Sequence, residues 1–108
     1  MKQGPNYIRD TFVILDSEII SDEDLIIEGQ VNTSKIDAKE HTCIVSLNAE
    51  INSDIHAGVI QIIGKVNGNI HASREITLAD TAQVNGDLTA PRIHLSPRAR
   101  LQGTISYN

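Results

Sequence analysis

Aromatic residues are scarce in this sequence of 108 residues, where they make up 3% of the chain and include no tryptophan. The three that occur, Tyr7, Phe12 and Tyr107, lie near the two ends of the chain. A core built mainly from aromatic rings is therefore excluded. The interior must be narrow enough for Val, Ile, Leu and Ala side chains to fill it.

Cysteine occurs once, as Cys43, so an internal disulfide is excluded. Cys43 stands at an apolar position, and we expect a small buried side chain in a reducing compartment. No apolar run approaches the roughly eighteen residues that a membrane span requires. We expect no secretory leader either, because Met1 is followed by polar and charged residues. These features predict a cytoplasmic protein, with any membrane association made through partners.

Basic residues are neither abundant nor clustered, and the net charge is −5. A nucleic-acid partner is therefore excluded, because binding to a phosphate backbone needs a basic surface. The acidic run at residues 22–24 is expected to be a solvated turn, which is the usual role of surface charge.

One phrase dominates the remaining sequence: VNGNIHA at residues 66–72 returns as VNGDLTA at residues 84–90. Weaker copies occupy residues 51–57 and 101–107, and a stretched copy occupies residues 31–38. An alternating apolar pair precedes each copy: Leu25/Ile27, Cys43/Val45, Ile60/Ile62, Ile76/Leu78 and Ile93/Leu95. The first members of these pairs are separated by 18, 17, 16 and 17 residues. Repetition at a fixed period of this length is typical of a solenoid.

The apolar residues recur at steps of two, which is the period of a β-strand. A repeat of about 17 residues, at about 3.3 Å per residue, spans about 56 Å and closes a triangle of three short strands. The sequence therefore predicts an all-β, single-domain parallel β-helix of about five to six triangular rungs. We assign it to residues 12–108, with a degenerate first rung, and expect residues 1–11 to be a short flexible arm.

Equivalent positions of the repeat should stack as ladders along the axis. We expect one inner ladder of Val31, Ile51, Val66, Val84 and Leu101, and a second of Ile36, Ile55, Ile70, Leu88 and Ile105. An outer ladder of amides should contain Asn32, Asn52, Asn67, Asn85 and Gln102. Gly68, Gly86 and Gly103 should form the corners that follow it, where positive φ is required. Pro91 and Pro97 are also expected in turns.

Candidates for chemistry are few. His56 and His71 share one repeat position and should lie one rung apart, but two histidines without a third ligand make a weak zinc site. Asp54 and Asp87 share another position and are separated by the rung of Asn69, so no close carboxylate pair is expected. We predict no catalytic residue, no metal site and no cofactor.

The unit V-x-G-x-I-x-A, together with Leu25-Ile26-Ile27-Glu28-Gly29 before it and Ala99-Arg100-Leu101-Gln102-Gly103 after it, resembles the bactofilin domain over residues 12–107. The resemblance implies a bacterial cytoskeletal protein with a right-handed β-helix that polymerises without nucleotide. It also implies a scaffold role in cell shape, with cell-envelope or peptidoglycan-modifying proteins as partners. The start of the chain matches poorly the apolar-basic membrane-targeting tip of some members, which argues against direct membrane binding.

Elementary physics predicts polymerisation independently, because an uncapped β-helix exposes unpaired backbone groups and apolar interior at both ends. We expect the contacts between subunits to involve Phe12, Val13 and Ile14 at one end and Leu101, Ile105 and Tyr107 at the other. Two alternatives stay open: a small left-handed β-helix enzyme of the hexapeptide acyltransferase or γ-carbonic-anhydrase type, and an adaptor that does not polymerise.

Overall fold

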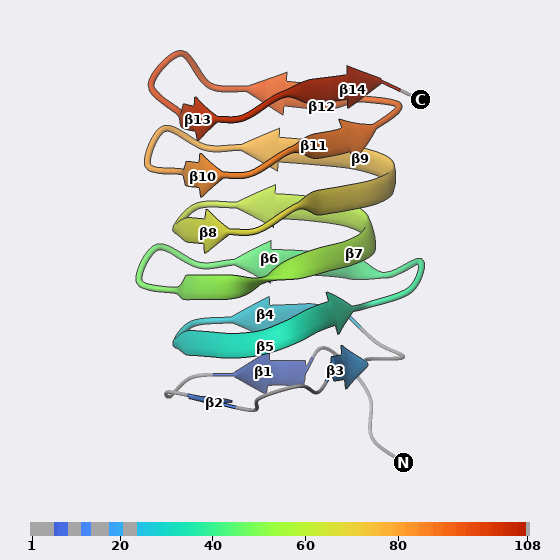
Figure 1. Cartoon of the computed structure of the whole chain (residues 1–108), viewed down its shortest axis with the longest axis vertical. Helices are drawn as coiled ribbons and strands as arrows, with labels where there is room; N and C mark the ends of the chain where they lie inside the picture. Colours follow the sequence, from blue (N-terminus) through green and yellow to red (C-terminus); the bar gives the residue numbers. More distant parts are fainter. Residues whose placement is uncertain (1–5, 9–11, 14–17, 21–23, 108) are drawn as a thin grey trace.

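The structure is a computed structural model that describes residues 6–8, 12–13, 18–20 and 24–107. In this part of the chain every regular element is a β-strand, and no helix occurs. All strand pairs are parallel and join into one sheet of 14 strands that winds around a central axis (Figure 1). The predicted all-β solenoid is confirmed.

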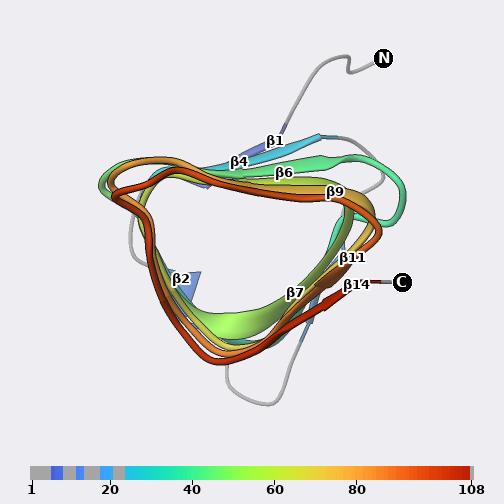
Figure 2. The same cartoon turned by 90° about the horizontal axis from the view of Figure 1, so that it is seen from above.

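The solenoid is triangular in cross-section, with three flat faces (Figure 2). The first face contains β1 (Asn6–Ile8), β4 (Leu25–Ile27), β6 (Thr42–Val45), the end of β7 (Glu50–Ile62), the end of β9 (Ile70–Leu78) and β12 (Ile93–Leu95). The second contains β2 (Phe12–Val13), the start of β5 (Gln30–Asp37), the start of β7, β8 (Lys65–Asn67), β10 (Gln83–Asn85) and β13 (Arg100–Gln102). The third contains β3 (Glu18–Ile20), the end of β5, the middle of β7, the start of β9, β11 (Leu88–Ala90) and β14 (Ile105–Tyr107).

These strands define rungs that we number from the N-terminus. The first lies within residues 6–20, the second covers 25–37, the third 42–57, the fourth 59–72, the fifth 75–90 and the sixth 93–107. Seen from above in Figure 2, the chain runs anticlockwise while it rises toward the C-terminus, so the solenoid is right-handed. This winding does not match the left-handed β-helix of the enzyme alternative.

The interior is filled by aliphatic side chains that stack from rung to rung. The residues expected in the two inner ladders of the second to fifth rungs are buried, with exposed fractions of 0–3%: Val31, Ile51, Val66, Val84, Ile36, Ile55, Ile70 and Leu88. Ala38, Ala57, Ala72 and Ala90 form a ladder of small buried residues beside them. Burying a Val, Leu or Ile side chain contributes roughly 1.5–3 kcal/mol. Repeated ladders therefore supply a continuous core without aromatic rings.

The first rung contains more of the chain than the sequence pattern indicates. Asn6–Ile8 lies in the range expected to be an arm, yet it forms β1 and pairs with β4 in register. Ile14 lies outside the described residues. Residues 9–11 also lie outside the described residues, so the predicted boundary between arm and β-helix at residue 12 stays a prediction.

The stretched copy of the repeat produces an irregularity in the second rung. β5 pairs with β7 in register from Gln30 to Asn32, and the register shifts by one residue before Lys35. A single extra residue on one strand is a β-bulge, which bends the strand locally. The inner ladders continue on both sides of the bulge, so the insertion is absorbed at the corner rather than in the core.

A charge in this core should unfold the solenoid. Val84 is 3% exposed, so Val84→Asp buries a carboxylate that has no partner, which costs several kcal/mol. We expect loss of the β-sheet signal in circular dichroism at 25 °C. Gln61→Asp, which changes an exposed residue, should keep the wild-type spectrum. A folded Val84→Asp protein would contradict the assigned core.

Candidate functional site

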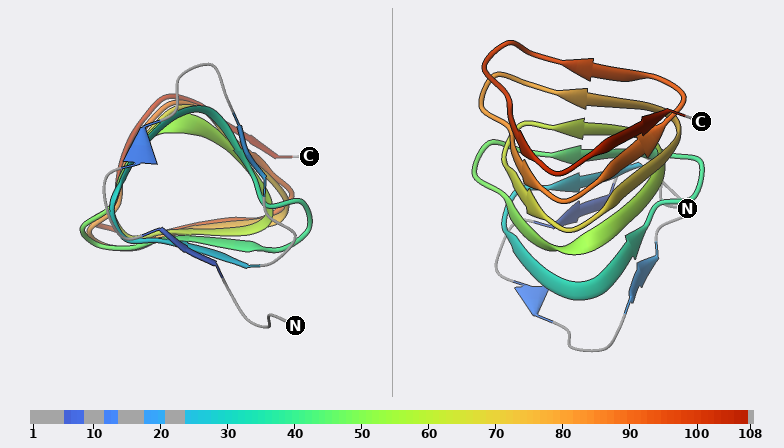
Figure 3. Two further views of the ribbon diagram at one scale, coloured as in Figure 1. Left: turned by 90° about the horizontal axis from the view of Figure 1, so that it is seen from below. Right: turned by 45° about the horizontal axis from the view of Figure 1, so that its top comes forward.

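The C-terminal end of the solenoid is open. β12, β13 and β14 pair with β9, β10 and β11 of the rung below, and no strand in the described part of the chain pairs with their other edge (Figure 3). The sixth rung therefore presents a row of unpaired backbone groups. Such an edge is a template for pairing with another chain.

The apolar residues of the sixth rung are only partly covered. Ile93, Ala99, Leu101 and Ile105 pack against the core but are half-buried, although their equivalents one rung below are buried. Leu95 is 45% exposed, while Leu78 in register below it is 1% exposed. The difference arises because no seventh rung covers them. The end of the core is thus an apolar surface.

Tyr107 interrupts the ladder of small residues at this end. It stands in register with Ala90, the last alanine of that ladder, and is 66% exposed. A phenol ring is much larger than an alanine side chain, and most of it is exposed because no described strand lies above this rung. The structure thus brings Leu101, Ile105 and Tyr107 together on one rung.

The predicted contact residues at the other end are described less fully. Phe12 and Val13 form β2 and are in register with Val31 and Asn32, which belong to an inner and an outer ladder respectively. These positions place β2 in the first rung. Its contacts with another subunit stay a prediction, as do those of Ile14.

The corner between the second and third faces is held by hydrogen bonds that link side chains to the next rung. The side-chain oxygen of Asp54 accepts a bond from the backbone N–H of Asn69 (2.9 Å), and that of Asn69 accepts from Asp87 N–H (3.1 Å). Asp87 in turn accepts from Thr104 N–H (3.0 Å). These bonds explain why short acidic or amide side chains recur here. Spacing alone did not reveal this structural role.

The glycines beside this corner are required by their conformation and by close approach of the chain. Gly68, Gly86 and Gly103 have φ of 155°, 153° and 151°, which L-residues with a side chain rarely adopt. A Cβ atom on Gly86 would lie 2.1 Å from the carbonyl oxygen of Gly68. The predicted glycine corners are confirmed.

The amide ladder on the second face is also present. Asn52 donates from Nδ2 to Oδ1 of Asn32 (2.5 Å), and Asn67 donates from Nδ2 to Oδ1 of Asn52 (2.9 Å). Asn32, Asn52 and Asn67 are therefore linked by side-chain hydrogen bonds along the axis. The ladder stabilises the stack of rungs.

His56 and His71 stack on the third face, with ring centroids 5.0 Å apart and an angle of 20° between the rings. Partial burial lowers the pKa of His56 from 6.5, and the charges of Lys35 and His71 lower it further against the opposing effect of Asp37 and Asp54. No group of three or more metal-ligating side chains occurs in the described residues. The pair is arranged for ring stacking.

Cys43 is fully buried in an inner ladder of the first face. Burial raises the pKa of its thiol to about 12, because a thiolate is poorly solvated there. The thiol therefore stays protonated at neutral pH, and its contribution is packing.

No helix long and apolar enough to cross a membrane occurs among the residues that the structure describes.

Substitution of a corner glycine should destabilise the stack. Gly86→Ala introduces a Cβ against the carbonyl oxygen of Gly68 at a backbone conformation unfavourable for alanine. We expect a loss of at least about 1–3 kcal/mol in the free energy of unfolding, measured by urea titration. The exposed Gln61→Ala should change it by less than about 0.5 kcal/mol. Equal stability of the two variants would argue against a conformational role for the glycine.

Stability should fall when His56 is protonated. Because the folded state lowers the pKa of His56, the unfolded chain binds more protons as the pH falls below about 6.5. The contribution of His56 is therefore present above pH 6.5 and is lost toward the lower folded pKa. We expect the urea midpoint to drop less between pH 7.0 and pH 5.5 in His56→Gln than in the wild type. Thr89→Gln, on the same outer ladder, should retain the wild-type dependence, and an unchanged pH dependence in His56→Gln would refute the interpretation.

Comparison with known proteins agrees with this architecture. The bactofilin family, described as polymer-forming cytoskeletal, matches residues 9–106. A curated relative, bactofilin BacO of Myxococcus xanthus (strain DK1622), is 36% identical over 103 residues, which cover 95% of this chain and 80% of the relative. No solved structure gives a significant match. Both the match over nearly the whole chain and the identity to BacO show that this chain belongs to the bactofilin family of polymer-forming cytoskeletal proteins.

Proposed function

We propose that the protein self-assembles end to end into filaments without nucleotide. The observation that carries this proposal is the open sixth rung, where unpaired backbone edges surround half-buried Leu101 and Ile105. Stacking a second subunit on this rung covers both features at once. Because backbone pairing and apolar burial coincide, the end is better suited to association than any outer face.

The apolar contribution is large enough to matter. Completing the burial of each exposed aliphatic side chain on the end contributes up to roughly 1.5–3 kcal/mol, and backbone pairing adds to it. Association of two proteins costs about 4–15 kcal/mol in lost freedom of motion. Several side chains at each end are therefore needed together, which is why we include Tyr107 and, at the other end, Phe12, Val13 and Ile14 in the contacts.

We further propose that the filament is a scaffold for cell-shape or cell-envelope proteins and has no catalytic activity of its own. The support is the family membership and the character of the outer faces, whose recurrent side chains hold the rungs together. A cytoplasmic location, with any membrane association made through partners such as peptidoglycan-modifying proteins, fits this role.

The proposal can be tested at the open end. Leu101→Lys and Ile105→Lys place a charge on the apolar end but leave the second to fifth rungs intact. We expect each variant to keep its β-sheet circular dichroism signal and to lose filaments in negative-stain electron microscopy without nucleotide or metal. Sedimentation at high speed should show at least a tenfold rise in protein left in the supernatant.

Gln61→Lys is the matched control, because it adds the same charge to the outer surface of the fourth rung. Its filaments should resemble those of the wild type. Wild-type particles that stay discrete would refute end-to-end assembly and favour the adaptor. Normal filaments from both end variants would show that the contact lies elsewhere.

A further inference from the structure

The second face presents two straight columns of polar side chains to the outside. In the second to sixth rungs one column contains Gln30, Glu50, Lys65, Gln83 and Arg100, which are in register. The other column is the amide ladder of Asn32, Asn52, Asn67, Asn85 and Gln102. Neither column contains an apolar side chain, so this face is a surface of charges and amides.

Lys65 on the fourth rung is in register with Glu50 on the third, and Arg100 is the charge on this face that lies farthest from Glu50. Glu50 lies on the third rung and Arg100 on the sixth, and both side chains are exposed. Three rungs at about 4.8 Å each place them about 14 Å apart, beyond the Debye length of about 8 Å at physiological salt. Within the described part of the chain neither residue forms an ion pair. Arg100 has only the uncharged Gln83 beside it in its column, whereas Glu50 has Lys65 one rung above, and both exposed side chains can reach another molecule.

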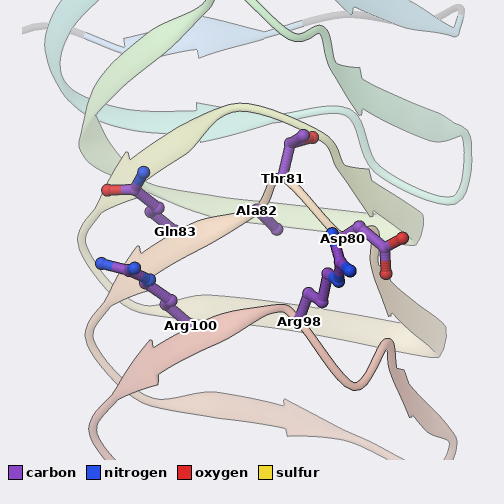
Figure 4. A pocket seen from close by; sticks show the side chains of 6 residues that line it. All are labelled: Asp80, Thr81, Ala82, Gln83, Arg98 and Arg100. Atoms are coloured by element: carbon purple, nitrogen blue, oxygen red, sulfur yellow. The ribbon is translucent and has the colours of Figure 1, made fainter.

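The close-up of this region shows which side chains share the face. Gln83 and Arg100 project to the same side from the fifth and sixth rungs, whereas Arg98 points toward the turn of Asp80 (Figure 4). Lys65, Gln83 and Arg100 line a shallow hollow of about 230 Å³. Arg100 is thus the cation that the face offers at its C-terminal end.

The order of residues in the two columns is self-complementary. A second copy can pack against this face with its solenoid axis antiparallel to that of the first. The two copies are then related by a two-fold axis that runs parallel to the strands and lies between the fourth and fifth rungs. This operation places Glu50 opposite Arg100 of the other copy, and Lys65 opposite Gln83 of the other copy. In the amide column it pairs Asn52 with Gln102 and Asn67 with Asn85. Each contact joins opposite charges, a charge with an amide, or two amides.

Other arrangements use the charges less well. An axis through the fourth rung places Lys65 opposite itself, which is repulsive. A two-fold axis between the third and fourth rungs pairs Glu50 with Lys65 of the other copy. It leaves Arg100 without a partner, because Arg100 then lies past the second rung of the other copy, where the two columns end. A parallel arrangement sets each column against the other column, so that no opposite charges meet. The antiparallel arrangement between the fourth and fifth rungs alone pairs both Glu50 and Arg100.

We propose that the second face is a lateral interface between filaments, in which a second copy of this chain packs antiparallel and Glu50 pairs with Arg100 across the contact. The inference rests on the proposed filament, because a contact with few charge pairs gains strength when it is repeated along a polymer. A filament repeats the face at every subunit, so weak contacts add up along its length. Isologous contacts of this kind are the commonest in homo-oligomers.

Charge reversal tests the pairing in the full chain. At 50 mM NaCl we expect wild-type filaments to lie side by side in negative-stain images, and low-speed centrifugation to pellet these bundles. Arg100→Glu and Glu50→Arg should each give single filaments, with at least a fivefold loss of low-speed pellet and an unchanged high-speed pellet. The double variant should restore bundles, because it exchanges the two charges. Arg92→Glu, which makes the same charge change at an exposed residue just before β12, is the control and should bundle normally.

The outcomes separate this proposal from the previous one. Absence of all filaments would refute end-to-end assembly, whereas single wild-type filaments at 50 mM NaCl would refute only the lateral interface. Bundling of Arg100→Glu at the wild-type level, or failure of the double variant to restore it, would also overturn the pairing. Vesicles of phosphatidylglycerol and phosphatidylcholine provide a second readout: loss of vesicle binding in Arg100→Glu with bundling unchanged would assign the face to anionic lipid instead.

Discussion

The structure depends on one constraint, which is that each strand pairs in parallel and in register with its equivalent in the next rung. A parallel pair fixes the rise between rungs at about 4.8 Å, so every side chain lies directly above its counterpart. Similar residues are then favoured at equivalent positions, because they pack or bond to one another along the axis. The aliphatic ladders, the Asn32–Asn52–Asn67 bonds and the Asp54–Asn69–Asp87 corner all follow from this alignment.

The same constraint divides the molecule into a closed interior and open ends. A central rung is covered on both sides, and its apolar residues are buried without help from aromatic rings. The sixth rung has the same backbone and similar residues, but its upper side lacks a partner among the described strands. Function in this protein is therefore expected at surfaces where the stack is incomplete or repeats a pattern, rather than in a pocket with assembled catalytic groups.

Much of the fold could be predicted from the sequence because each rung is nearly a copy of the last. The period of about 17 residues predicts where equivalent strands recur in the sequence. Gly68 and Gly86 mark corners whose backbone conformation favours glycine. The strand at Asn6–Ile8 could not be found in this way, since it lacks the repeated phrase and is specified by pairing with β4. The corner bonds of Asp54 and Asp87 were also missed, because they depend on the distance between rungs. The contact candidates Leu101 and Ile105 could be predicted because they take the places of Val84 and Leu88 in the repeat.

Tyr107 has a consequence for the axial repeat of a filament built from this chain. Every described rung from the second to the fifth has an alanine where the sixth has this ring, so the cross-section of the solenoid cannot simply continue past it. A subunit that docks there must offer a different surface from the one that an internal rung offers. Each junction would then be chemically distinct from the rungs on either side. The axial repeat of the polymer would thus be the whole chain rather than the single rung.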